Sequence, residues 1–201
     1  MKDLWALERT LRARGVRHPA GVDEAGRGPL AGPVVAAAVI FPEGFSHPEI
    51  DDSKRLTAPQ RERLVPVITA AAVAWAVAEA PPEEIDAVNI LQATLRAMMR
   101  AVAGLALAPD YLLVDGPVRP PLLIPGEGVV GGDRRVACIA AASILAKVHR
   151  DGLMEGHDGR WPAYGFRANK GYGTPGHLRA LAEHGPCPIH RRSFRGVLPS
   201  R

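Results

Sequence analysis

Cysteine and long apolar segments are both scarce in this sequence of 201 residues. The two cysteines, Cys138 and Cys187, are too few for a disulfide framework and predict a reducing compartment. Cys187 and His190 have the spacing of a zinc ligand pair, but no second pair would complete four ligands. The longest apolar run is Ala70–Ala78, whereas a bilayer-spanning helix needs roughly 20 residues. We therefore expect no transmembrane helix.

The first 17 residues also lack the features of a secretion signal. They mix charges with leucines at helical spacing, and no apolar core is followed by small residues. The composition, with 47% hydrophobic and 23% charged residues, is typical of a soluble globular protein. These features together predict a cytoplasmic protein that does not contact membranes.

The positive charge of the chain is concentrated near its C-terminus. Between Arg160 and Arg201 there are eight basic residues and one acid, Glu183, which gives +7, while the net charge of the whole chain is +4. Such an asymmetry indicates either a surface that faces a polyanion or a solvated basic tail. Charge alone does not separate these two readings.

Hydrophobic periodicity predicts an alternation of strands and helices. Strands are expected at residues 20–24, 33–41, 72–79 and 111–114, and helices at 57–68, 89–105, 136–154 and 174–185. Pro66 is expected to kink the first of these helices, and residues 115–132 are expected to form a proline-containing loop. A strand, helix, strand order favours a parallel crossover. The predicted fold is a mixed sheet covered by helices.

Acidic residues stand beside glycines where predicted strands end. These positions are Asp23 and Glu24, Asp115, and Asp133, which follows a glycine pair. A buried unpaired carboxylate is costly, and Mg²⁺ or Mn²⁺ would stabilise a cluster of them. Each acid taken alone has a simpler interpretation as a cap, a turn residue or half of an ion pair. Because neighbours in a strand point to opposite faces, Asp23 and Glu24 can share a site only if the strand bends, and nearby glycines permit a bend.

Five motifs closely resemble the bacterial ribonuclease HII family, in the family order, from about residue 20 to 195. They are GVDEAGRGPLAGPV at 21–34, DSK at 52–54, VDG at 114–116, GD at 132–133 with IAAASILAKVHRD at 139–151, and KGYGT at 170–174 with His177. Pro117, the pair Arg134 and Arg135, and Pro66 depart from the usual pattern. None of these departures removes a carboxylate, so they bear on substrate contacts more than on the chemistry.

The resemblance implies a ribonuclease H-like α/β fold, in which a mixed five-stranded sheet is flanked by helices. Residues 1–158 would form the catalytic domain, and residues 159–201 a basic helical C-terminal extension packed on it. The resemblance also places the catalytic, metal-binding carboxylates of the family at Asp23, Glu24, Asp115 and Asp133. In the family these carboxylates bind two Mg²⁺ or Mn²⁺ ions. An aspartate at position 133 is typical of type two enzymes, since type three relatives carry glutamate there.

The resemblance also implies a substrate. It is RNA paired with DNA, including a single ribonucleotide in duplex DNA, cut on the 5′ side of the ribonucleotide to leave a 3′-hydroxyl and a 5′-phosphate. Gly26, Arg27 and Gly28 match the segment that contacts the ribose 2′-hydroxyl, and glycines there would let the backbone approach the sugar closely. Tyr172 matches a tyrosine that stacks on the next sugar. Lys54 is a candidate phosphate contact.

Simpler interpretations stay open for these substrate contacts. Two glycines can mark a plain turn, Tyr172 can cap the last helix, and Lys54 can be a solvated lysine. Four further residues match the family without a clear role. Asp151 is expected to form a structural ion pair, whereas His177, Arg191 and Arg192 would fit either phosphate contact or packing of the C-terminal part.

Two other functions compete with metal-dependent hydrolysis. A ribonuclease that uses the 2′-hydroxyl as nucleophile, with histidines as acid and base, would need no metal and would leave a cyclic phosphate. None of the seven histidines is next to the acidic strand ends in sequence. A non-catalytic module that binds hybrids would explain the basic C-terminus but not the complete acid set. A monomer is the default expectation for the oligomeric state.

Overall fold

A computed structural model describes residues 3–198. Five strands in this range form one mixed sheet. The strand order is β3-β2-β1-β4-β5. The strands are β1 (Pro19–Ala25), β2 (Val34–Ile40), β3 (Ala74–Ala80), β4 (Tyr111–Asp115) and β5 (Gly126–Val129). Strand β2 is antiparallel to β1 and β3, whereas β4 is parallel to β1 and β5. The predicted mixed sheet is confirmed, but β5 lies in the segment that the residue pattern assigned to a loop.

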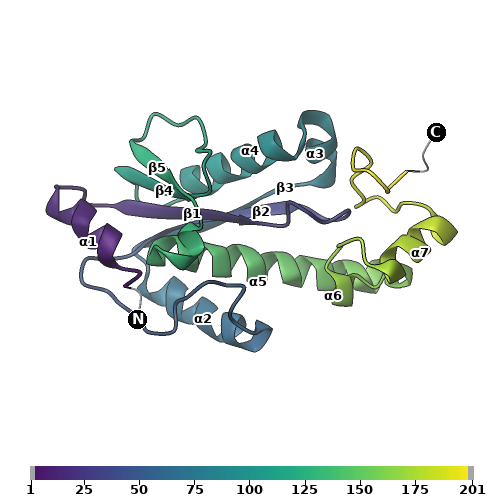
Figure 1. Cartoon of the computed structure of the whole chain (residues 1–201), viewed down its shortest axis with the longest axis horizontal. Helices are drawn as coiled ribbons and strands as arrows, with labels where there is room; N and C mark the ends of the chain where they lie inside the picture. The colour runs from purple at the N-terminus through teal and green to yellow at the C-terminus, as the bar shows by residue number, and fades with distance from the viewer. Residues whose placement is uncertain (1–2, 199–201) are drawn as a thin grey trace.

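Helices cover both faces of this sheet (Figure 1). They are α1 (Ala6–Ala13), α2 (Ala58–Ala71), α3 (Pro82–Val88), α4 (Ile90–Ala103), α5 (Ala137–Arg160), α6 (Phe166–Asn169) and α7 (Pro175–His184), with 3-10 turns at Gly132–Arg134 and Pro162–Tyr164. Helices α2 and α5 lie on one face, and α4 on the other. Pro66 lies inside α2, which continues to Ala71. None of these helices, within residues 3–198, is long and apolar enough to cross a membrane.

Strand β2 is buried on both faces because its sequence, VVAAAVI, carries apolar side chains at every position. Val35, Ala37 and Val39 face the core beneath α5, and the alternate residues face the core beneath α4. Small residues bring the layers close together. A Cβ atom at Gly21 would lie 2.1 Å from the carbonyl carbon of Cys138, so β1 packs directly against the α5 backbone. This contact brings the backbones of β1 and α5 close together.

The C-terminal part forms a third apolar cluster at the far end of α5 (Figure 1). Its buried members are Ala31, Met154, Tyr164, Phe166, Ala180, Leu181, Cys187 and Ile189. Ala31 belongs to the β1–β2 connection and forms a bridge with His190. The predicted helical extension therefore packs on this connection. The domain boundary expected at residue 158 falls inside α5, and the division into two domains stays a prediction.

Candidate active site

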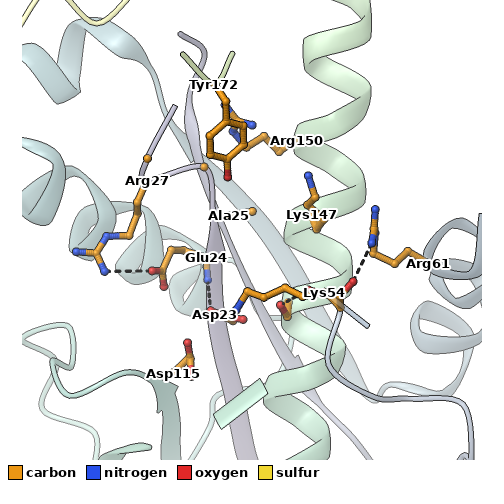
Figure 2. Close-up of a pocket in the computed structure, with 14 residues that line it drawn as sticks. Asp23, Glu24, Ala25, Arg27, Lys54, Arg61, Asp115, Lys147, Arg150 and Tyr172 are labelled. Atoms are coloured by element: carbon orange, nitrogen blue, oxygen red, sulfur yellow. Dashed lines mark hydrogen bonds and ion pairs between the residues drawn. The ribbon is translucent and has the colours of Figure 1, made fainter. Parts of the chain in front are cut away.

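A pocket of about 310 Å³ opens where β1 and β4 end. Its lining residues are Asp23, Glu24, Ala25, Gly26, Arg27, Gly28, Ser53, Lys54, Arg61, Asp115, Ser143, Lys147, Arg150 and Tyr172. The acids come from the sheet, whereas Arg61 and Lys147 come from helices α2 and α5 (Figure 2). The pocket therefore has an acidic side and a basic side.

The acids meet because β1 extends beyond its parallel neighbour. Pairing between β1 and β4 stops at Val22 and Val114, so Asp23 and Glu24 follow directly on one strand and Asp115 on the other. Pairing of β1 with β2 is regular as far as Ala25, and the chain turns only at Gly26, whose φ is +93°. The expected bend thus follows both acids rather than separating them. Both nevertheless line the pocket, because they follow the last β1 residue that pairs with β4.

Burial and like-charged neighbours disfavour ionisation of Asp23 and Glu24. Asp23 is only 3% exposed, and its pKa is raised well above the ordinary value by burial and by the charges of Glu24 and Asp115. The pKa of Glu24 is raised by burial, while Arg27 acts in the opposite direction through an ion pair of 3.3 Å. The Glu24 amide donates to Asp23 Oδ1 at 2.7 Å. A cation placed here would relieve the repulsion.

The fourth predicted acid, Asp133, is buried in a 3-10 turn and does not line the pocket. Its Oδ2 accepts from Lys54 Nζ at 2.7 Å, and Lys54 does line the pocket. The neighbouring Gly132 amide donates to Asp115 Oδ1 at 2.6 Å, which ties the turn to β4. Within residues 3–198, no group of three or more histidine, cysteine or acidic side chains is arranged to hold a metal ion. The structure thus gathers three of the four acids and pairs the fourth with a lysine.

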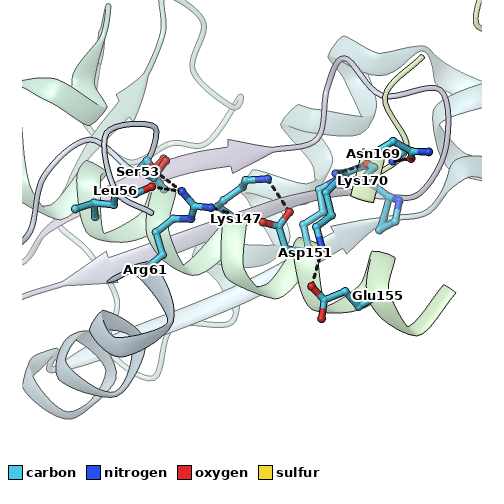
Figure 3. A network of polar contacts seen from close by, with 12 residues as sticks. Ser53, Leu56, Arg61, Lys147, Asp151, Glu155, Asn169 and Lys170 are labelled. Atoms are coloured by element: carbon cyan, nitrogen blue, oxygen red, sulfur yellow. Dashed lines mark hydrogen bonds and ion pairs between the residues drawn. The ribbon is translucent and has the colours of Figure 1, made fainter. Parts of the chain in front are cut away.

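The basic side of the pocket belongs to a polar network between α2 and α5 (Figure 3). Lys147 Nζ donates to Asp151 Oδ1 at 2.6 Å, which confirms the ion pair expected for Asp151. Arg61 donates to the carbonyls of Ser53 at 2.8 Å and Leu56 at 2.5 Å. Sequence analysis missed Arg61 and Lys147. The sequence offered one signal, for Lys147. It is one of only four lysines, and it precedes Asp151 by one helical turn, which is the spacing of an ion pair on a helix.

The predicted sugar-contacting segment also lies at this pocket. Arg27 and Gly28 are exposed, and Tyr172 is 48% exposed. A Cβ atom at Gly28 would lie 3.6 Å from the Tyr172 ring, so the two residues are neighbours across the pocket edge. The expected exposure of Tyr172 is confirmed.

The remaining family residues have different surroundings. His177 and Arg191 are buried and contact other parts of the protein, which assigns them to packing in this structure. The backbone amide of Arg192 donates to Asp86 at 2.9 Å, while its side chain is exposed. Arg150, which the motif contains but sequence analysis did not single out, is buried and lines the pocket.

Comparisons with known proteins agree with this architecture. The family model described as Ribonuclease HII matches residues 20–197. A ribonuclease HII from Geobacter metallireducens is 55% identical over 196 residues, which cover 98% of this chain and 92% of that protein. The crystal structure of ribonuclease H2 from Pyrococcus horikoshii OT3 aligns with a TM-score of 0.77 and 28% identity, covering 90% of this chain and 95% of that one.

A more distant structure shares the fold alone. Bst-RNase HIII, solved in complex with Mn²⁺, has a TM-score of 0.68 and 17% identity, and the alignment covers 91% of this chain and 68% of that one. The close similarities span nearly the full chain, and the family match covers the positions of all five motifs. This chain therefore belongs to the ribonuclease HII family of type 2 ribonuclease H hydrolases.

Proposed function

We propose that the protein is an endoribonuclease that needs divalent metal ions. It hydrolyses RNA in RNA–DNA hybrids and at single ribonucleotides in duplex DNA, cutting 5′ of the ribonucleotide to leave a 3′-hydroxyl and a 5′-phosphate. The observation that carries the proposal is the group of Asp23, Glu24 and Asp115 in one pocket, where burial and then the charges of Glu24 and Asp115 raise the pKa of Asp23. We further propose that the enzyme acts as a cytoplasmic monomer, and both cysteines are free and buried, which suits a reducing compartment.

The chemistry of the donor set fits hard divalent cations. Asp23, Glu24 and Asp115 offer carboxylate oxygens, which Mg²⁺ and Mn²⁺ prefer, and their mutual repulsion favours a bound cation. Asp133 would complete the set once Lys54 releases it. Two bound ions would activate water for attack on phosphorus and stabilise the leaving oxygen. The Mn²⁺ complex of the distant Bst-RNase HIII supports this choice of metals.

The other pocket residues are suited to holding a nucleic acid strand. Lys54, Arg61 and Lys147 carry positive charge next to the acids and would contact phosphates. The backbone of residues 26–28 would approach the 2′-hydroxyl, which distinguishes RNA from DNA. The exposed ring of Tyr172 would stack on the adjacent sugar. No protein nucleophile is needed.

The two competing functions have less support. No histidine is among the residues that line the pocket, which disfavours a metal-free enzyme with histidine as acid and base. A module that only binds hybrids would not require acids that repel one another inside the pocket.

The test uses a duplex with one ribonucleotide, labelled at either end and incubated with Mg²⁺, with Mn²⁺ and with a chelator. We expect a single cut 5′ of the ribonucleotide, only with metal, and no cut in the all-DNA duplex. Asp115→Asn should lose nearly all turnover and still bind the duplex. Near wild-type turnover in that variant, or a 2′,3′-cyclic phosphate after chelation, would refute the proposal.

A further inference from the structure

The connection between β1 and β2, residues 26–33, is held from behind by a buried arginine. Arg191 has no exposed surface, and its guanidinium donates to four carbonyls of this connection. The acceptors are Gly32 at 2.9 Å, Arg27 at 2.9 Å, Pro29 at 2.8 Å and Gly26 at 2.5 Å. A single side chain thus binds four of the eight carbonyl groups of the segment.

A second buried arginine completes the support. Arg150 donates to the carbonyls of Pro33 at 3.0 Å and Ala31 at 3.1 Å, and also to that of Lys170 at 3.0 Å, two residues before Tyr172. Within residues 3–198, neither arginine forms an ion pair with a carboxylate. Seven backbone carbonyls therefore stabilise two buried cations, an arrangement that is costly unless the hydrogen bonds are well formed.

The support explains why glycine is needed at position 26. A Cβ atom there would lie 2.0 Å from Arg150 Nε, and the φ of +93° also disfavours a side chain. At Gly28 the nearest atom to such a Cβ is in Tyr172, at 3.6 Å, which is ordinary contact. A side chain at position 26 would thus collide with the supporting Arg150, whereas one at position 28 would make only ordinary contact with Tyr172.

With its carbonyls bound from behind, the segment has free donors at the pocket. Within residues 3–198, the amides of Gly26, Arg27 and Gly28 donate to no protein acceptor, and all three residues line the pocket. Successive free amides next to buried cations form a site for an oxygen ligand with lone pairs. A sugar hydroxyl is such a ligand.

We infer that Arg191 and Arg150 are positioning residues that set the preference of the site for a ribonucleotide. They hold the carbonyls of residues 26–33 inward, so that the free amides of residues 26–28 remain available to the 2′-hydroxyl of a bound strand. This inference rests on the proposed function. It assigns the discrimination between ribose and deoxyribose to the arginine support as well as to the residues that touch the sugar.

The test measures binding in the Asp115→Asn background, where cleavage does not interfere. Lysine at position 191 keeps the charge but has a single nitrogen, which cannot reach four carbonyls. For Arg191→Lys we expect about a tenfold loss of affinity for a duplex with one ribonucleotide, which corresponds to one lost hydrogen bond. The affinity for an all-DNA duplex of the same sequence should not change. Fluorescence anisotropy gives both values.

The ratio of the two affinities separates positioning from plain stability. A merely structural role would lower both affinities by the same factor and leave their ratio unchanged, which would overturn the inference. Arg179→Lys, on the exposed side of α7, is the matched control and should change neither affinity. Should Arg191→Lys fail to fold, as shown by circular dichroism, Arg150→Lys is expected to lower the same ratio. If the parent variant itself shows no preference for the ribonucleotide duplex, the proposed function fails instead.

Discussion

A buried histidine pair makes the stability of the C-terminal part sensitive to acid. The amide of Cys187 donates to His190 Nδ1 at 3.0 Å, so the proton of a neutral His190 must be on Nε2. That nitrogen lies 2.9 Å from His177 Nε2, which therefore accepts, and His177 Nδ1 donates to the Tyr172 carbonyl at 2.8 Å. Each ring has one donor and one acceptor, and an added proton would break this chain of hydrogen bonds.

The expected size of the effect follows from the pKa of His190. Burial, and secondly the neighbouring His177, lower this pKa to about 4, while the unfolded chain keeps the ordinary value of 6.5. Between these values the unfolded state binds more protons, so stability is fully present above pH 6.5 and falls as the pH drops toward 4. At pH 5 the loss from this one residue is about 2 kcal/mol, which for a chain of this size lowers the melting temperature by roughly 4–8 °C.

The assay compares urea unfolding of the wild type and His190→Gln at pH 7 and pH 5. Glutamine does not titrate, so the stability advantage of the wild type over the variant should shrink by about 2 kcal/mol at the lower pH. Leu178→Gln, at an exposed position of α7, is the matched control, and its difference from wild type should be the same at both pH values because neither side chain titrates. An unchanged advantage of the wild type over His190→Gln would refute the reasoning.

Two further predictions test the packing of β1 and the basic side of the pocket. Gly21→Ala should lower the free energy of unfolding by about 3 kcal/mol, because the added carbon would meet the backbone of Cys138. Gly152→Ala should not destabilise the protein, because Gly152 lies in α5 with open space around it. Thermal unfolding of the two variants compares their stabilities. Lys54→Met should weaken duplex binding and reduce the slope of log affinity against log salt by about 0.9, as measured by anisotropy titrations.

Elements with a strong hydrophobic period were predictable from the sequence, and elements created by tertiary contacts were not. The helix expected at 89–105 is α4, and the strand expected at 72–79 is β3, within two residues at each end. Strand β5 has the sequence GEGV, which has little tendency to form a strand. It forms because its glycines fit closely: a Cβ at Gly126 would lie 2.3 Å from the Leu112 carbonyl. Helix α3, which begins at Pro82, was not among the helices expected from the hydrophobic period.

That Asp23, Glu24 and Asp115 meet in one place was predictable, because all three stand at the ends of predicted strands and match the family motifs. The residues that pair with these acids were not predictable. That Lys54 binds Asp133, 79 residues away, depends on how two loops meet, and no sequence pattern encodes it. In the same way, Arg191 matched the family, but the residue type alone does not show whether its side chain binds a phosphate or a backbone carbonyl.

The basic C-terminus shows the same limit of sequence reasoning. Its charge of +7 suggested either a polyanion-binding surface or a solvated tail. In the structure Arg191 is buried, and Lys170 and Arg167 pair with Glu155 and Asp158 of α5 at 2.6 and 3.8 Å. Three of the eight basic residues are therefore buried inside the protein or paired with acids of α5. Lys54, Arg61 and Lys147, in contrast, share one pocket with the acids, an arrangement that the proposed enzyme needs and a simple binding module does not.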